Sequence, residues 1–122
     1  QSKDFRNVGN IGLDIEIKKT DNLTIFFNDT LPTENIYYII FFTGKIFKNE
    51  TKNIDPCILF INGYDFIKDS PWVNEYYKEI NELKNKWCRG ENKKKLSGPM
   101  EVYTRPTFKA NIKHFINNSD YT

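Results

Sequence analysis

The chain has 122 residues, a formal net charge of +2 at pH 7, two cysteines and one histidine. This length predicts a single domain over residues 1–122, and the nearly balanced charge argues against a dedicated nucleic-acid binder, which concentrates positive charge on one face. The sequence has no apolar run of the ~18 residues that a membrane span needs, so we expect no insertion into a membrane.

The first half of the chain is rich in strand signals. Apolar and polar residues alternate over residues 11–18, which predicts a strand with its isoleucines and leucine on one buried face. Turn residues follow at 19–22 and a second strand at 23–27, so we expect these two strands to form a hairpin. Residues 36–42 are apolar throughout, which is typical of a central strand buried on both faces.

The second half combines a hairpin signal with one convincing helix. Asn62 and Gly63 stand between two β-rich runs and tolerate the positive φ of a type I′ turn, so we expect a hairpin here. Ser70 and Pro71 suit the start of a helix that ends near Arg89. An apolar stripe follows this helix at steps of three and four residues, through Val73, Tyr76, Tyr77, Ile80, Leu83 and Trp87.

Two late strands, at residues 100–104 and 108–116, complete the pattern. With the earlier elements they predict an α+β fold, a mainly antiparallel sheet of about six to eight strands with one long helix packed on it. A small closed β-barrel with the helix outside is the alternative.

Four N-glycosylation sequons begin at Asn22, Asn28, Asn49 and Asn117. The first two have even numbers in a segment whose core residues are odd-numbered, so strand alternation directs both away from the core. Residue types with A/T-rich codons dominate the chain, and in such a composition a cytosolic or bacterial protein also acquires sequons by chance. We expect an extracellular, secreted glycoprotein whose signal peptide has been removed, since the Gln1-Ser-Lys opening suits a mature N-terminus.

The two cysteines, Cys57 and Cys88, are an even number in an oxidising compartment, which predicts a disulfide between them. This bond would join a strand start to the last turn of the helix, so it requires the helix to pack across that strand. Two free thiols are the alternative, and they would go together with an intracellular location.

Residues for catalysis are sparse. His114 falls on the inner face of a predicted strand, where a packing role is expected rather than that of a general base. Two distant cysteines do not make a zinc site, and we expect no cofactor. Asp14 and Glu16 share one strand face, which allows a paired-carboxylate hydrolase, although a solvated strand face has the same pattern.

A candidate binding surface lies on the helix and the loop that follows it. Its members are one aromatic residue at the helix start and basic residues at and beyond its end: Trp72, Lys84, Arg89, Lys93, Lys94 and Lys95. The basic residues suit an anionic glycan or an acidic protein patch. Trp72 is a candidate anchor if exposed and a core residue if buried.

The sequence favours a secreted, non-enzymatic binding glycoprotein, or one domain of a viral or parasite surface protein that engages a host protein. A carrier of a small apolar ligand with an aromatic-lined cavity is the second hypothesis, and the carboxylate-based hydrolase is the third. An exposed apolar patch would favour the binding protein, an enclosed cavity of several hundred Å³ the carrier, and a carboxylate cleft the hydrolase.

Overall fold

The computed structural model describes residues 4–46, 53–94 and 98–122. Its strands are β1 (Phe5–Val8), β2 (Leu13–Thr20), β3 (Thr24–Asn28), β4 (Ile36–Phe42), β5 (Lys45–Ile46), β6 (Asn53–Ile54), β7 (Cys57–Asn62) and β8 (Thr107–Asn111). Its helices are α1 (Tyr64–Ile67), α2 (Val73–Trp87), α3 (Glu91–Lys94) and the short 3₁₀ helix η1 (Ile112–His114). The mixed, mostly antiparallel α+β architecture is as predicted, and the described strands do not close into a barrel.

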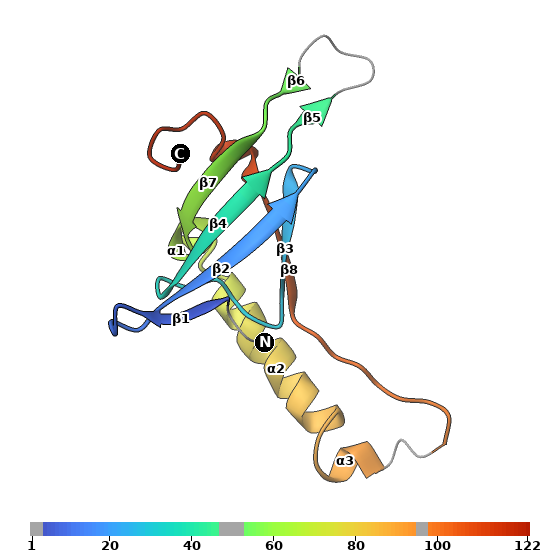
Figure 1. Ribbon diagram of the computed structural model, residues 1–122. Coiled ribbons are helices and arrows are strands. Elements are labelled where there is room, and N and C mark those ends of the chain that lie inside the picture. Colours follow the sequence, from blue (N-terminus) through green and yellow to red (C-terminus); the bar gives the residue numbers. More distant parts are fainter. Residues whose placement is uncertain (1–3, 47–52, 95–97) are drawn as a thin grey trace.

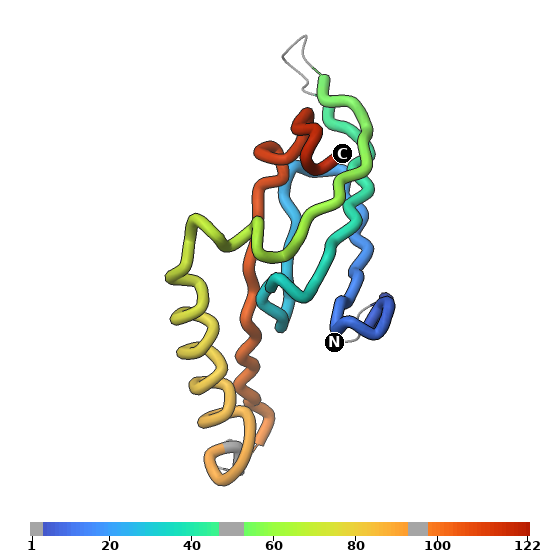
Figure 2. The backbone as a smooth tube through the Cα atoms, turned by 90° about the vertical axis from the view of Figure 1, so that its left-hand side faces the viewer, coloured from blue at the N-terminus to red at the C-terminus, as the bar shows by residue number. Residues whose placement is uncertain are grey.

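The strands are divided among three sheets rather than one. The main sheet has the order β1-β2-β4-β7, and β3-β8 and β5-β6 form two-stranded sheets. Among the described strands, only β2 and β4 pair in parallel. Figure 2 shows the β3–β8 ribbon as a second layer, with α2 beyond it. We call the side of the main sheet toward this ribbon the inner face and the opposite side, which faces the viewer in Figure 1, the outer face.

The predicted hairpin between the first two strands is wrong. β3 pairs with β8, while β2 lies between β1 and β4. Both edges of β2 are therefore occupied, and the turn at residues 21–23 carries the chain from the main sheet to the ribbon. The turn signal was local, whereas the pairing depends on strands far away in the sequence.

The hydrophobic core lies between the inner face and the ribbon. It consists of Ile25, Phe27, Ile36, Tyr38, Ile40, Phe42, Leu59, Ile61, Ile112 and Phe115. The Phe27 ring meets Tyr38 and Phe66 edge to face, with centroids 5.1 and 5.0 Å away, and such pairs contribute about 0.5–1.5 kcal/mol beyond their burial. The core thus holds the two layers together through aromatic contacts.

The late strands are shorter than predicted. Residues 100–104 form no strand, and the strand expected at 108–116 ends at Asn111 and continues as η1. The Asn111 side chain accepts a hydrogen bond from the Lys113 N–H at 2.9 Å and so caps this short helix. The change from strand to helix leaves His114 exposed, so its predicted place on an inner strand face is wrong.

The predicted hairpin at Asn62-Gly63 is also wrong, because Gly63 has helical φ and ψ of −55° and −33° and begins α1. A Cβ atom at this position would collide with the backbone of Thr33. The glycine is therefore required by the close approach of two chain segments rather than by a positive φ. The Asn62 side chain reinforces the contact by donating to the Glu34 carbonyl at 2.9 Å.

Helix α2 confirms the helix predicted from Pro71 to Arg89, within two residues at each end, but its apolar stripe is not buried. No residue of α2 is buried, and its aromatic contacts with the ribbon are made by Tyr76 and Tyr77, whose rings lie 5.6 and 5.9 Å from that of Phe108. Beyond this junction the helix extends away from the sheets (Figure 2). We call residues 73–94 together with residues 98–105 the arm, and the rest of the described chain the body.

Candidate functional site

Strand β2 directs its isoleucines to the outer face. In the β2–β4 ladder Glu16 lies beside Tyr38, a core residue of the inner face, and the next residue, Ile17, therefore points outward. The prediction that the isoleucines of this strand are buried in the core is wrong, since Ile17 is exposed. Alternation shows which residues share a face, but it does not show which face is covered.

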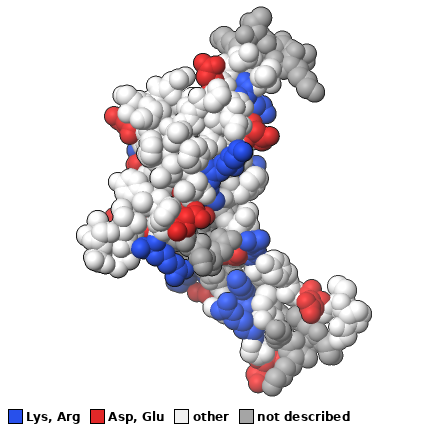
Figure 3. All heavy atoms as spheres, in the orientation of Figure 1, with Lys and Arg blue, Asp and Glu red and all other residues white. Residues whose placement is uncertain are grey.

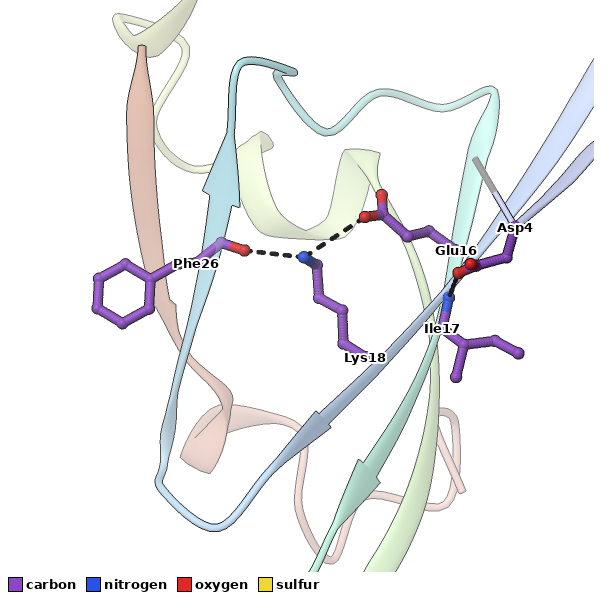
Figure 4. Close-up of polar contacts among 5 residues, drawn as sticks. All are labelled: Asp4, Glu16, Ile17, Lys18 and Phe26. Carbon is purple, nitrogen blue, oxygen red and sulfur yellow. Dashed lines mark hydrogen bonds and ion pairs between the residues drawn. The ribbon is translucent and has the colours of Figure 1, made fainter. Parts of the chain in front are cut away.

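Polar contacts hold the other face of β2 against the ribbon (Figure 4). The Lys18 ammonium donates to the Phe26 carbonyl at 2.8 Å and lies 3.6 Å from Glu16 Oε1. It also lies 5.3 Å from the centroid of the Phe27 ring. Beside β1, the Ile17 N–H donates to Asp4 Oδ2 at 2.6 Å. These contacts fix the register of β2 and keep its isoleucines on the outer face.

The two candidate carboxylates share one strand face, as predicted, but this is the inner face rather than a solvated one, and each has a local structural partner. Asp14 Oδ1 accepts from the Asn7 N–H at 3.0 Å, and Glu16 pairs with Lys18. The space beside Glu16 and Tyr38 is about 10 Å³, enough for about one water and far too small for a sugar ring. Burial, with a smaller contribution from Glu16, raises the pKa of Tyr38 far above its ordinary value. The space beside Glu16 is therefore not the carboxylate cleft that a glycoside hydrolase needs.

The outer face is apolar across all four strands of the main sheet. Its members are Phe5, Ile15, Ile17, Tyr37, Ile39, Phe41, Ile58 and Phe60. One row runs from Ile17 through Ile39 to Phe60, and Phe60 is 50% exposed. Figure 3 shows a broad area without charged side chains over β2, β4 and β7, with charges mainly at its margin. This is a contiguous patch rather than scattered apolar residues.

The binding surface predicted from the sequence divides into two places. Trp72 is 67% exposed at the start of α2, whereas Lys84 and Arg89 lie near its end, roughly 20–25 Å away along the helix. There they line a hollow of about 310 Å³ with Trp87 and Tyr103. The side chains of residues 93–95 lie outside the described part of the structure, so the full basic cluster is not assembled.

The sequon asparagines that the structure describes lie away from the main sheet. Asn22 is exposed in the turn before β3, and Asn117 is exposed after η1. Asn28 is on the side of β3 opposite to Ile25 and Phe27, as the alternation predicted. Asn49 is outside the described residues. None of the three described asparagines belongs to a strand of the main sheet, so glycans on them would leave the outer face open; glycosylation itself stays a prediction.

The predicted disulfide is absent, because Cys57 and Cys88 are both free. The start of β7 and the end of α2 lie at opposite ends of the molecule (Figure 1). The Cys88 thiol instead donates to the Val102 carbonyl at 3.4 Å, and burial raises the pKa of Cys57. The prediction failed because it required α2 to pack across β7, whereas the helix extends away from the main sheet.

Comparisons of the chain with protein-family models, curated proteins and solved structures found no match. Within the described residues, no three His, Cys, Asp or Glu side chains are grouped so as to hold a metal ion. In the same residues no helix combines the length and apolar character needed to cross a membrane.

Proposed function

We propose that this chain is an extracellular, N-glycosylated, non-enzymatic protein that binds another protein through the outer face. The observation that carries the proposal is the contiguous apolar face across β2, β4 and β7, on which Ile17, Phe41 and Phe60 are exposed. Residues such as Phe41 and Phe60 are of the aromatic type that is enriched in the cores of protein interfaces. The extracellular location rests on the sequons alone, because two free thiols are the arrangement that goes with an intracellular location.

The composition of β4 supports a covered outer face. An uninterrupted apolar strand is typical of a sheet with both faces covered, and the described chain covers only the inner one.

The partner that fits this face has a complementary apolar surface. Lys19 is the one charged residue that shares the face within β2, β4 and β7, so binding would depend on shape and burial more than on charge. The chain is also rich in residues with A/T-rich codons, which motivates a further proposal. In it the chain is a viral or parasite protein and the partner is a host protein that it binds.

The carrier hypothesis has less support. An aromatic-lined hollow of about 410 Å³ lies between β8 and the start of α2, but the exposed Trp72 borders it. It is therefore an open groove rather than the enclosed cavity that a carrier of small apolar molecules would need.

Site-specific photo-crosslinking tests the proposal. A benzoylphenylalanine would replace Phe60 on the outer face or, as a matched control, Phe26, which is equally exposed on the ribbon. After incubation with extract of the native source or its host, we expect a discrete covalent adduct only from position 60. The adduct should disappear when Ile39→Lys is added. Equal adducts from both positions, or an adduct that survives Ile39→Lys, would contradict the proposal.

A further inference from the structure

Strand β8 has a neighbouring strand on one side only. It pairs with β3 and with no other strand in the described parts of the chain. At the two ends of this ladder, the Ile112 N–H donates to the Leu23 carbonyl and the Asp29 N–H donates to the Pro106 carbonyl, both at 2.8 Å. Hydrogen-bonded pairs recur at every second residue of an antiparallel ladder, so even-numbered residues of β8 direct their backbone groups toward β3.

The odd-numbered residues of β8 consequently direct their backbone groups the other way. These residues are Thr107, Lys109 and Asn111, and their N–H and C=O groups point to the free edge of the ribbon. They recur at the two-residue spacing of a strand and so form a ready template for one more strand.

Two adjoining hollows follow this free edge. The first, of about 410 Å³, has a largely apolar lining that includes Leu31, Phe66, Val73, Tyr76 and Phe108, with Trp72 exposed beside it. The second, of about 520 Å³, is more polar and continues along Asn111 to His114. Phe66, Ser70, Lys109 and Ala110 border both hollows, so together they form one groove, which we call the β8-edge groove.

An extended polypeptide matches both properties of the β8-edge groove. Its backbone can pair with the free edge, and its alternate side chains can enter the apolar hollow, which is how strand addition combines affinity with specificity. A helix has already used its backbone groups internally, and a small apolar molecule would leave the edge groups unpaired.

We propose that the β8-edge groove binds an extended segment of another polypeptide as an additional strand beside β8. A bulky apolar side chain of that segment occupies the hollow lined by Phe66, Val73 and Tyr76. This site goes beyond the proposed function, because β8 belongs to the ribbon and not to the main sheet with its outer face.

The test uses fluorescein-labelled peptides of the sequence Lys-Thr-Val-Thr-X-Thr-Val-Lys, with X as Leu, Phe or Asp, in fluorescence polarisation. The peptides with Leu or Phe should bind at least about tenfold more tightly than the peptide with Asp, because only an apolar side chain suits the hollow. Tyr76→Ala should reduce this preference, and Phe26→Ala, on the far side of the ribbon, should not change it. Binding weaker than about 1 mM for every peptide would overturn the proposal.

Two substitutions at one position test strand addition itself. Lys109→Pro removes the edge N–H without affecting the ladder to β3, since proline is tolerated where the N–H of an edge strand faces outward. Lys109→Ala keeps that N–H. We expect about a tenfold loss of affinity for the proline variant and less than about threefold for the alanine variant. Equal affinities of the two variants would overturn the proposal.

N-methylated peptides keep the test decisive if Lys109→Pro does not fold. With the unchanged protein, methylation at alternate peptide residues should weaken binding by about tenfold at one set of positions and hardly at the other. A uniform effect along the peptide would show that the backbone does not pair with β8.

Discussion

The body and the arm both contain strongly patterned segments, but only the body encloses its apolar residues. In the body, Ile40, Leu59 and Ile61 have no exposed surface. In the arm, Leu83 belongs to an apolar helical stripe and is still 49% exposed. Periodicity therefore determines which residues lie together on a face, whereas burial requires a second element to pack against that face.

The junction between the two regions is small and specific. Besides the contacts of Tyr76 and Tyr77 with Phe108, the Tyr77 hydroxyl donates to the Asp29 carbonyl at 3.1 Å. The Arg105 guanidinium donates to the Asp29 carboxylate at 2.9 Å. The arm is thus attached at its base, and its far end adds little to the stability of the body.

Two glycine substitutions should show the largest difference between the body and the arm in the free energy of unfolding. We expect Gly63→Ala in the body to destabilise the fold by about 3 kcal/mol or more, because the new Cβ meets the Thr33 backbone. Gly90→Ala in the arm has free space and should cost only about 1 kcal/mol, from its φ of +68°. Urea denaturation of both variants provides the measurement. Similar losses would show that the two regions do not differ in packing.

A second pair compares apolar side chains. Ile61→Ala in β7 should cost about 2–4 kcal/mol through lost burial and a cavity. Leu83→Ala should cost less than about 1 kcal/mol, whereas the helical stripe read from the sequence alone predicts a loss of about 2–4 kcal/mol. Thermal unfolding distinguishes these values, and a large loss for Leu83→Ala would mean that the arm packs against another surface in solution.

Adjacent lysines test the orientation of β2 within the body. Lys18→Ala should cost about 1–2 kcal/mol, because it removes the hydrogen bond to the Phe26 carbonyl and the contact with the Phe27 ring. Lys19→Ala, on the outer face, should change the free energy of unfolding by less than about 0.5 kcal/mol. If Lys19→Ala were the more costly change in chemical denaturation, the register of β2 would be reversed.

Alkylation of the two cysteines compares the body with the arm in the unchanged protein. Mass spectrometry after alkylation without reductant should find both thiols labelled. The labelling rate of Cys57 should still be rising at pH 9, because burial raises its pKa above the ordinary value of 9.0 and alkylation needs the thiolate. Protection of both residues from alkylation would restore the disulfide that the sequence predicted.

Features with a local cause were predictable from the sequence. Pro71 and the apolar stripe located α2 to within two residues, although its N-cap is Trp72 rather than the predicted Ser70 and makes no side-chain hydrogen bond. The apolar run of residues 36–42 located β4, which indeed lies between β2 and β7. Features that depend on distant segments were not predictable. The Asn62-Gly63 pair has a turn signal, but the approach of Thr33 determines its conformation.

The candidate site was only partly visible in the sequence. The sequence indicates Trp72 as an anchor candidate, but it does not indicate the outer face, because the alternation in residues 11–18 predicts Ile15 and Ile17 in the core. The signal that could have found it is the doubly apolar β4 combined with alternate apolar residues in its neighbours, such as Ile58 and Phe60. Too many apolar residues for one core indicate a second buried face.

The dissociation constant of the partner captured through position 60, measured with Phe60→Lys and Phe26→Lys, tests whether the outer face is the binding surface. A charge placed at the centre of an apolar interface should weaken binding by about 100-fold or more. Because Phe60 is half exposed, its replacement should leave the fold intact. We predict this loss for Phe60→Lys alone, with unchanged affinity for Phe26→Lys. Unchanged affinity for Phe60→Lys would show that the outer face is not the binding surface.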